Sequence, residues 1–80
     1  MKKILVISLT KFYGGGESFI ASHLQSIDNI DFYYFIASEQ LFAQLSTDKK
    51  YLVTNTNLTS VAKQVANIVE QNQIDIVIYS

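Results

Sequence analysis

Three consecutive glycines, Gly14, Gly15 and Gly16, stand directly before Glu17 and shortly after the apolar run Lys2–Leu9. Glycine has no Cβ, so a loop of this composition lets its backbone amides come very close to a ligand. A carboxylate in the first turn of a following helix is stabilised by the helix dipole, and it can accept hydrogen bonds from hydroxyl groups. This glycine loop, from Thr10 to Glu17, is therefore the strongest candidate binding site in the sequence.

Two phosphate-binding motifs can be compared with this loop. The dinucleotide fingerprint Gly-x-Gly-x-x-Gly is matched by Gly14 and Gly16, but bulky Phe19 occupies the place of its third glycine. The lysine-type phosphate loop fails, because Glu17 stands where its lysine should be. A ligand with both hydroxyl and phosphate groups fits the loop better. Two plainer interpretations stay open: the glycines form a permissive turn, and Glu17 only begins a helix.

Residues outside the loop offer little further chemistry. Glu39 follows the second strand-like run, near the usual place of a ribose-binding acid. His23 is the sole histidine, and without a carboxylate neighbour in sequence its simpler interpretation is a half-buried structural residue. Cysteine is absent, and one histidine gives no metal site. We therefore expect no catalytic residue, metal or cofactor within the chain itself.

The segments that must position the loop alternate between strand-like and helix-like patterns. Continuous apolar or aromatic runs predict strands, and apolar residues at helical spacing predict helices. The expected strands are Ile4–Leu9, Asp31–Ala37, Lys50–Val53 and Ile74–Tyr79, and the expected helices are Glu17–Ile27, Glu39–Leu45 and Thr59–Gln71. Ser38 is expected to cap the second helix, and Asn72 to be the left-handed residue after the third. The stretch Thr54–Asn57 is expected to be a loop.

This order of elements predicts a Rossmann-like α/β fold with a parallel sheet. The expected strand order is 3-2-1-4, numbered along the chain, with the first two helices on one face and the third on the other. The order reverses between the first and fourth strands, so a crevice is expected at their carboxyl ends. The glycine loop and Tyr79 would meet at this crevice.

Size and charge limit the classes of partner. The chain has 80 residues and a formal net charge of −1, so residues 1–80 are expected to form one small domain. Its cationic residues are scattered lysines, which argues against nucleic acid as a partner. No apolar run is long enough for a transmembrane span, and the signal-peptide features of the first residues are incomplete. We expect a cytoplasmic protein.

The segment KILVISLTKFYGGGESFIASHL resembles the N-terminus of GT-B fold glycosyltransferases of the large retaining family 4 (glycosyl transferases group 1). In that family an apolar first strand leads into Gly-Gly-x-Glu and then an amphipathic helix. Gly14, Gly15, Gly16 and Glu17 match this motif. The closing segment QNQIDIVIYS is similar to a later strand of the family, so the resemblance spans the whole chain.

The resemblance implies an enzyme with two Rossmann-like domains and a cleft between them. The N-terminal domain would hold a saccharide or lipid acceptor, and the C-terminal domain the nucleotide-sugar from which a hexosyl unit is transferred. Gly14–Gly16 would form the cleft loop and Glu17 its anchor. The family's histidine and paired acids would lie outside these 80 residues, so this acceptor-side portion is expected to be inert by itself.

Two other interpretations remain open. The chain could be a non-catalytic α/β module that binds a partner or assembles with itself, or a weak nucleotide-binding Rossmann unit. Because the chain stops at the end of its fourth strand, we expect either a truncated fold or an oligomer. An oligomer would form through the apolar edge strand 74–79, whose backbone groups would be free to pair with another chain.

Overall fold

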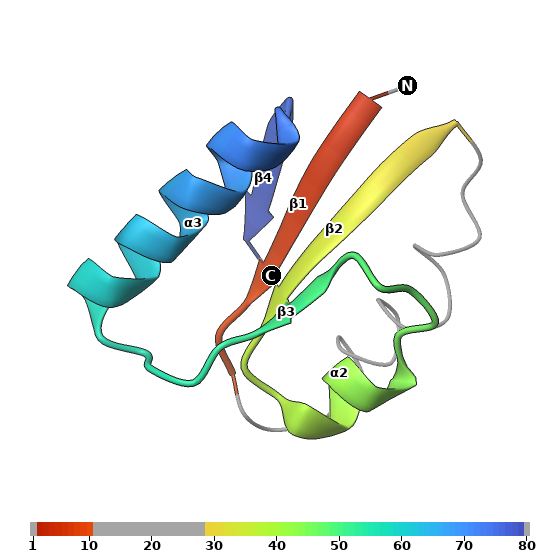
Figure 1. The fold of residues 1–80 in the computed structure, drawn as a ribbon. Coiled ribbons are helices and arrows are strands. Elements are labelled where there is room, and N and C mark those ends of the chain that lie inside the picture. The colour runs from red at the N-terminus through yellow and green to blue at the C-terminus, as the bar shows by residue number, and fades with distance from the viewer. Residues whose placement is uncertain (1, 11–28, 80) are drawn as a thin grey trace.

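The computed structural model describes residues 2–10 and 29–79. The described residues form four strands and two helices, labelled as in Figure 1. In chain order these are β1 (Lys2–Ser8), β2 (Ile30–Ile36), α2 (Glu39–Gln44), β3 (Lys50–Leu52), α3 (Leu58–Asn72) and β4 (Ile76–Tyr79). The predicted first helix, Glu17–Ile27, lies outside the described residues.

The four strands form one parallel sheet in the order β3-β2-β1-β4, which confirms the predicted topology. The carboxyl ends of neighbouring strands lie level with one another. Ser8 of β1 is paired with Ile36 of β2, Ile36 with Leu52 of β3, and Ile7 with Tyr79 of β4. All four strands therefore end at one edge of the sheet.

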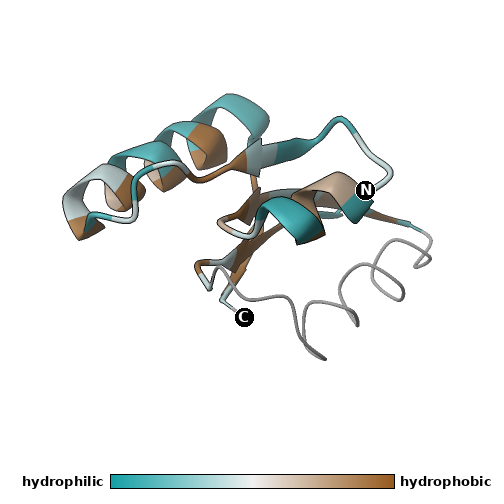
Figure 2. Cartoon of the chain, turned by 90° about the horizontal axis from the view of Figure 1, so that it is seen from below, coloured by the Kyte–Doolittle hydropathy of each residue, from teal (hydrophilic) through white to brown (hydrophobic). Residues whose placement is uncertain are grey.

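The two faces of the sheet carry separate apolar clusters because successive side chains of a strand point in opposite directions. On one face, α3 packs against the odd-numbered residues of β1 and β2: Leu5, Ile7, Tyr33 and Phe35. On the other, α2 packs against the even-numbered ones: Ile4, Val6, Tyr34 and Ile36. Helices thus cover both faces, as predicted, and the apolar positions of α3 lie along its sheet-facing side (Figure 2).

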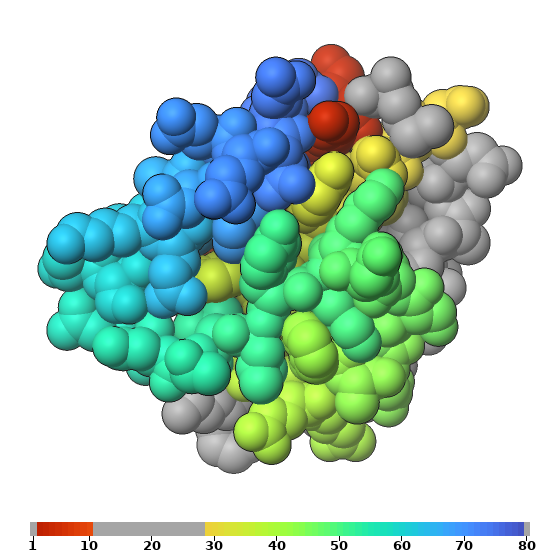
Figure 3. All heavy atoms as spheres, viewed as in Figure 1, coloured from red at the N-terminus to blue at the C-terminus, as the bar shows by residue number. Residues whose placement is uncertain are grey.

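Helix α2 is fixed at both ends by side chains. The Ser38 hydroxyl accepts a hydrogen bond from the Leu41 amide at 3.2 Å, which confirms the predicted N-cap. At the other end, the Lys50 ammonium donates to the carbonyls of Phe42 at 2.8 Å and Leu45 at 3.1 Å. A cation near the last carbonyls of a helix is favourable, because these carbonyls form the negative end of the helix dipole. Because Lys50 begins β3, this contact connects the end of α2 to the sheet, and β3 reaches the surface between α2 and α3 (Figure 3).

The predicted start of α3 was one residue late. The helix begins at Leu58, and Asn57, which had been predicted as part of a loop, is its N-cap. The Asn57 side-chain oxygen accepts hydrogen bonds from the Thr59 amide at 3.0 Å and the Ser60 amide at 3.4 Å. These two bonds satisfy amide groups that have no partner within the helix.

The predicted end of α3 was also one residue early. Gln73, with φ 55°, is the left-handed residue, and Asn72 remains in the helix. The side-chain amide of Asn72 donates hydrogen bonds to the Ile68 carbonyl at 3.0 Å and to the Tyr51 hydroxyl at 3.2 Å. Both contacts favour its helical position. Ile74 then donates its amide to the Val69 carbonyl at 3.0 Å, so it belongs to the turn and not to the strand.

Strand β4 therefore begins at Ile76 and not at Ile74. Its entry is tied to β1 by hydrogen bonds with Lys3. The Asp75 amide donates to the Lys3 carbonyl at 2.8 Å, and the Asp75 carboxylate accepts from the Lys3 amide at 2.9 Å. The predicted starts of α2 at Glu39 and of β3 at Lys50 and the predicted end of β4 at Tyr79 are confirmed, and the other boundaries shift by one or two residues.

Candidate binding site at the carboxyl edge of the sheet

The order of the strands reverses between β1 and β4, and their carboxyl ends lie side by side at Ile7 and Tyr79. From β1 the chain continues through Leu9 to Thr10, which is exposed at this edge. Thr10 is where the glycine loop begins. In open parallel sheets, ligands bind in the crevice outside the carboxyl ends of strands at such a reversal.

The predicted site residues Gly14, Gly15, Gly16 and Glu17 lie outside the described residues, and so does His23. Their role therefore stays a prediction. The described part of the site consists of the chain that leads to the loop and of the neighbouring strand ends.

Hydrogen bonds extend the sheet to this edge beyond the strands themselves. The Ala37 amide donates to the Ser8 carbonyl at 2.9 Å, and the Val53 amide donates to the Ile36 carbonyl at 2.7 Å. These bonds hold the ends of β1, β2 and β3 level. Loops that leave this edge thus start from a firmly hydrogen-bonded scaffold.

Ser8, the last residue of β1, has a fully buried hydroxyl for which the described residues provide no hydrogen-bond partner. Buried polar groups are nearly always paired, so an unpaired one is a feature to be explained. Sequence reasoning did not identify this residue, because a serine at the end of an apolar strand carries no distinctive pattern. The end of β1 therefore holds a buried hydroxyl whose hydrogen-bonding capacity is unused among the described residues.

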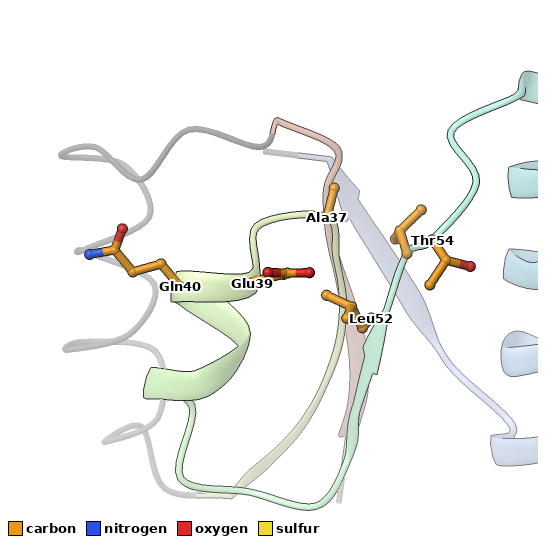
Figure 4. A pocket seen from close by; sticks show the side chains of 6 residues that line it. Ala37, Glu39, Gln40, Leu52 and Thr54 are labelled. Atoms are coloured by element: carbon orange, nitrogen blue, oxygen red, sulfur yellow. The ribbon is translucent and has the colours of Figure 1, made fainter.

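A hollow of about 390 Å³ opens at the same edge, between the ends of β2 and β3. It is lined by Ala37, Glu39, Gln40, Leu52, Val53 and Thr54 (Figure 4). The hollow arises because β3 is only three residues long and α2 begins three residues after β2 ends. We call it the β2–β3 hollow.

Glu39 provides the charge of the β2–β3 hollow. Its carboxylate points toward Leu52, whereas the Gln40 amide points away (Figure 4). Glu39 is exposed, and within the described part of the chain it makes no hydrogen bond or ion pair. The sequence had singled out Glu39 as a residue near a ribose-binding position, and the structure puts it at the edge of the sheet where ligands bind. Thr54 was not identified, because only the pairing of β2 with β3 brings it near Glu39.

The opposite edge of the sheet carries a surface ion pair between Lys49 and Asp31. The hydrogen bond to Asp31 raises the pKa of the Lys49 ammonium, and that ammonium also lies 5.4 Å from the centre of the Tyr33 ring. Tyr34, close to this pair, has a buried hydroxyl with no hydrogen-bond partner in residues 2–10 and 29–79, and burial raises its pKa to about 12. Tyr34 belongs to the buried apolar cluster on the α2 face of the sheet.

Residues 2–10 and 29–79 contain no group of histidine, cysteine and acidic residues that could hold a metal ion. No helix in this part of the chain is both long and apolar enough to cross a bilayer. Comparisons of the chain with protein-family models, curated proteins and solved structures found no match. The functional argument therefore depends on the residues of this chain.

Proposed function

We propose that this chain is the acceptor-side, N-terminal unit of a GT-B type glycosyltransferase and that it is inert by itself. The complete enzyme transfers a hexosyl unit from a nucleotide-sugar to a hydroxyl of a saccharide or lipid. The observation that supports the proposal is the parallel sheet in the order 3-2-1-4, whose first strand ends at Ser8 and is followed, after Thr10, by the Gly14–Glu17 motif. A glycine loop at the strand reversal lies where α/β sheets bind ligands.

The residues of this chain would hold and orient the acceptor. The backbone amides of Gly14, Gly15 and Gly16 can approach a phosphate from the side, and Glu17 accepts a hydrogen bond from an acceptor hydroxyl. In the transfer, the bond from the anomeric carbon to the diphosphate oxygen breaks, and a bond to the acceptor oxygen forms. The acceptor hydroxyl loses its proton, and the nucleoside diphosphate leaves.

The coding sequence that follows Ser80 gives a direct test. The proposal expects a further αβ unit and then a second Rossmann-like domain with a pair of acidic residues that binds the donor. A stop codon after Ser80 would contradict the proposal, and so would a following domain without a nucleotide-sugar site.

A second candidate is a module that assembles with a second copy of itself through β4. The observation that favours it is the exposure of every β4 side chain: Ile76 42%, Val77 37%, Ile78 42% and Tyr79 69%. The strand carries no charged residue and lies at the end of the sheet, where backbone groups have no neighbouring strand among the described residues. Two copies could pair their β4 strands about a two-fold axis, which predicts a concentration-dependent dimer.

A further inference from the structure

The described lining of the β2–β3 hollow comes from residues 37–40 and 52–54, and the proposed function does not depend on it. Its volume of about 390 Å³ falls at the lower end of the range of small-molecule sites, roughly 300–1,000 Å³. It opens at the same carboxyl edge as the start of the loop. The hollow is therefore of a size and in a place where a small ligand could bind.

The chemistry of the lining favours a ligand that donates hydrogen bonds and carries no negative charge. Glu39 is the one charged residue among the described lining residues, and an ionised carboxylate only accepts hydrogen bonds. The Thr54 hydroxyl points away from Glu39 (Figure 4). Because the described lining contains no lysine or arginine, a phosphate there would face a carboxylate without a compensating cation.

The rest of the described lining is firmly held. The side chains of Ala37 and Val53 are buried in the core on the α3 face, and the hydrogen bonds that extend the sheet fix their backbone. Leu52 adds a half-buried side chain to the lining. A sugar ring presents C–H groups on its faces and hydroxyls around its edge, so it can pack on Leu52 and still reach Glu39.

Glu39 is available to a ligand. Ser38 already caps α2 through its bond to the Leu41 amide, and Glu39 has no partner of its own in the described part of the chain. Its carboxylate lies on the side of the hollow that faces β3 (Figure 4).

We propose that the β2–β3 hollow is a subsite for the hydroxyls of a neutral sugar ring. Glu39 accepts hydrogen bonds from adjacent ring hydroxyls, and an apolar face of the ring packs against Leu52. The assignment of the sugar to the acceptor rests on the proposed function; the preference for uncharged hydroxyls over phosphate rests on the lining alone.

The test is a titration of the ¹⁵N-labelled 80-residue chain, followed by NMR. Methyl α-D-glucopyranoside and methyl α-D-mannopyranoside are added into the millimolar range, and inorganic phosphate and uridine are added separately. We expect saturable shifts of the amides of Glu39, Leu52 and Thr54 with at least one glycoside and none with phosphate. Glu39→Gln should weaken glycoside binding about tenfold, because it replaces a hydrogen bond to a charged group with a neutral one.

A control variant keeps the test specific. Glu70→Gln removes a carboxylate from the exposed surface of α3 and should leave binding unchanged. The subsite is overturned if neither glycoside shifts these amides, if uridine or phosphate binds there instead, or if Glu39→Gln binds as well as wild type.

The result is independent of the proposed function. Glycoside binding at the hollow without hexosyl transfer by the complete polypeptide would overturn the proposed function and leave the subsite intact. If Glu39→Gln leaves the rate of hexosyl transfer unchanged and the glycosides shift no amide signals, only the subsite would be overturned.

Discussion

At the scale of single residues, Tyr34 lies in the middle of the core with its ring 1% exposed and its hydroxyl unpaired. Its neighbours on that face of the sheet are aliphatic or aromatic, and the Phe32 ring lies 6.3 Å away between centroids. An unpaired hydroxyl in such surroundings loses its bonds to water on folding and gains none in return. Its burial also favours the neutral phenol over the phenolate.

Tyr34→Phe is therefore expected to be neutral or stabilising at pH 7, by up to about 1–2 kcal/mol, because it removes the unpaired group and keeps the ring. The matched control is Tyr51→Phe, whose hydroxyl accepts a hydrogen bond from Asn72 at 3.2 Å. That variant should lose about 0.5–1.5 kcal/mol. Urea denaturation measures both. A loss for Tyr34→Phe larger than that for Tyr51→Phe would show that the Tyr34 hydroxyl is paired in solution.

The same hydroxyl makes stability depend on alkaline pH. The pKa of Tyr34 rises from 10.0 to about 12 on folding, so between these values the unfolded chain releases a proton that the folded protein keeps. Unfolding is then favoured as pH rises, by on the order of 2–3 kcal/mol across this window. Thermal melts from pH 9 to 12 should show a shallower loss for Tyr34→Phe than for wild type, and parallel losses would contradict the assignment.

At the scale of elements, α3 shows which parts of the fold could be predicted. Val61 and Ile68 face the core at helical spacing, and this periodicity indicated both the helix and its buried side. Its ends could not be predicted from local pattern, because Asn57, Asn72 and Gln73 can each occupy more than one position at a helix terminus. The contact between Asn72 and Tyr51 decides the C-terminal end, and it joins residues that are distant in sequence.

Gln73 carries the strain of this helix end, since a left-handed conformation is unfavourable for a residue with a Cβ. Gln73→Gly should therefore raise the free energy of unfolding by about 0.5–1 kcal/mol. The matched control, Gln71→Gly, lies within α3 and should lower it by a similar amount. Chemical denaturation compares the two, and the same sign for both variants would contradict the left-handed assignment.

At the scale of the whole molecule, the order of strands was predictable and the hollow was not. Alternating strands and helices allow few parallel topologies, so 3-2-1-4 could be predicted from the pattern. The glycine loop was predicted from composition alone and lies outside the described residues, so it stays a prediction. The β2–β3 hollow needs the pairing of Ile36 with Leu52 to bring Glu39 near Thr54, and no local pattern contains that information.

The association of two copies of the chain can be tested by a substitution in β4. If two copies pair through this strand, sedimentation equilibrium should show a dimer that Ile78→Lys weakens at least about tenfold, because a charge on the paired strand opposes burial. The control is Leu58→Lys, which changes an apolar side chain that is 81% exposed on α3. A monomer at every concentration would contradict association through β4, and so would equal weakening by both variants.

The central claim is that the predicted glycine loop, which follows β1, binds and orients the acceptor of a glycosyl transfer. Its most direct measurement is the rate of hexosyl transfer from a nucleotide-sugar by the complete polypeptide that contains these residues, with Gly15→Val compared with wild type. Asp48→Val, at an exposed bend near the opposite edge of the sheet, is the control. The account predicts a loss of about a hundredfold or more for Gly15→Val, because the added side chain keeps the backbone from the ligand, with the unfolding midpoint and the Asp48→Val rate unchanged. An undiminished transfer rate in Gly15→Val would contradict it.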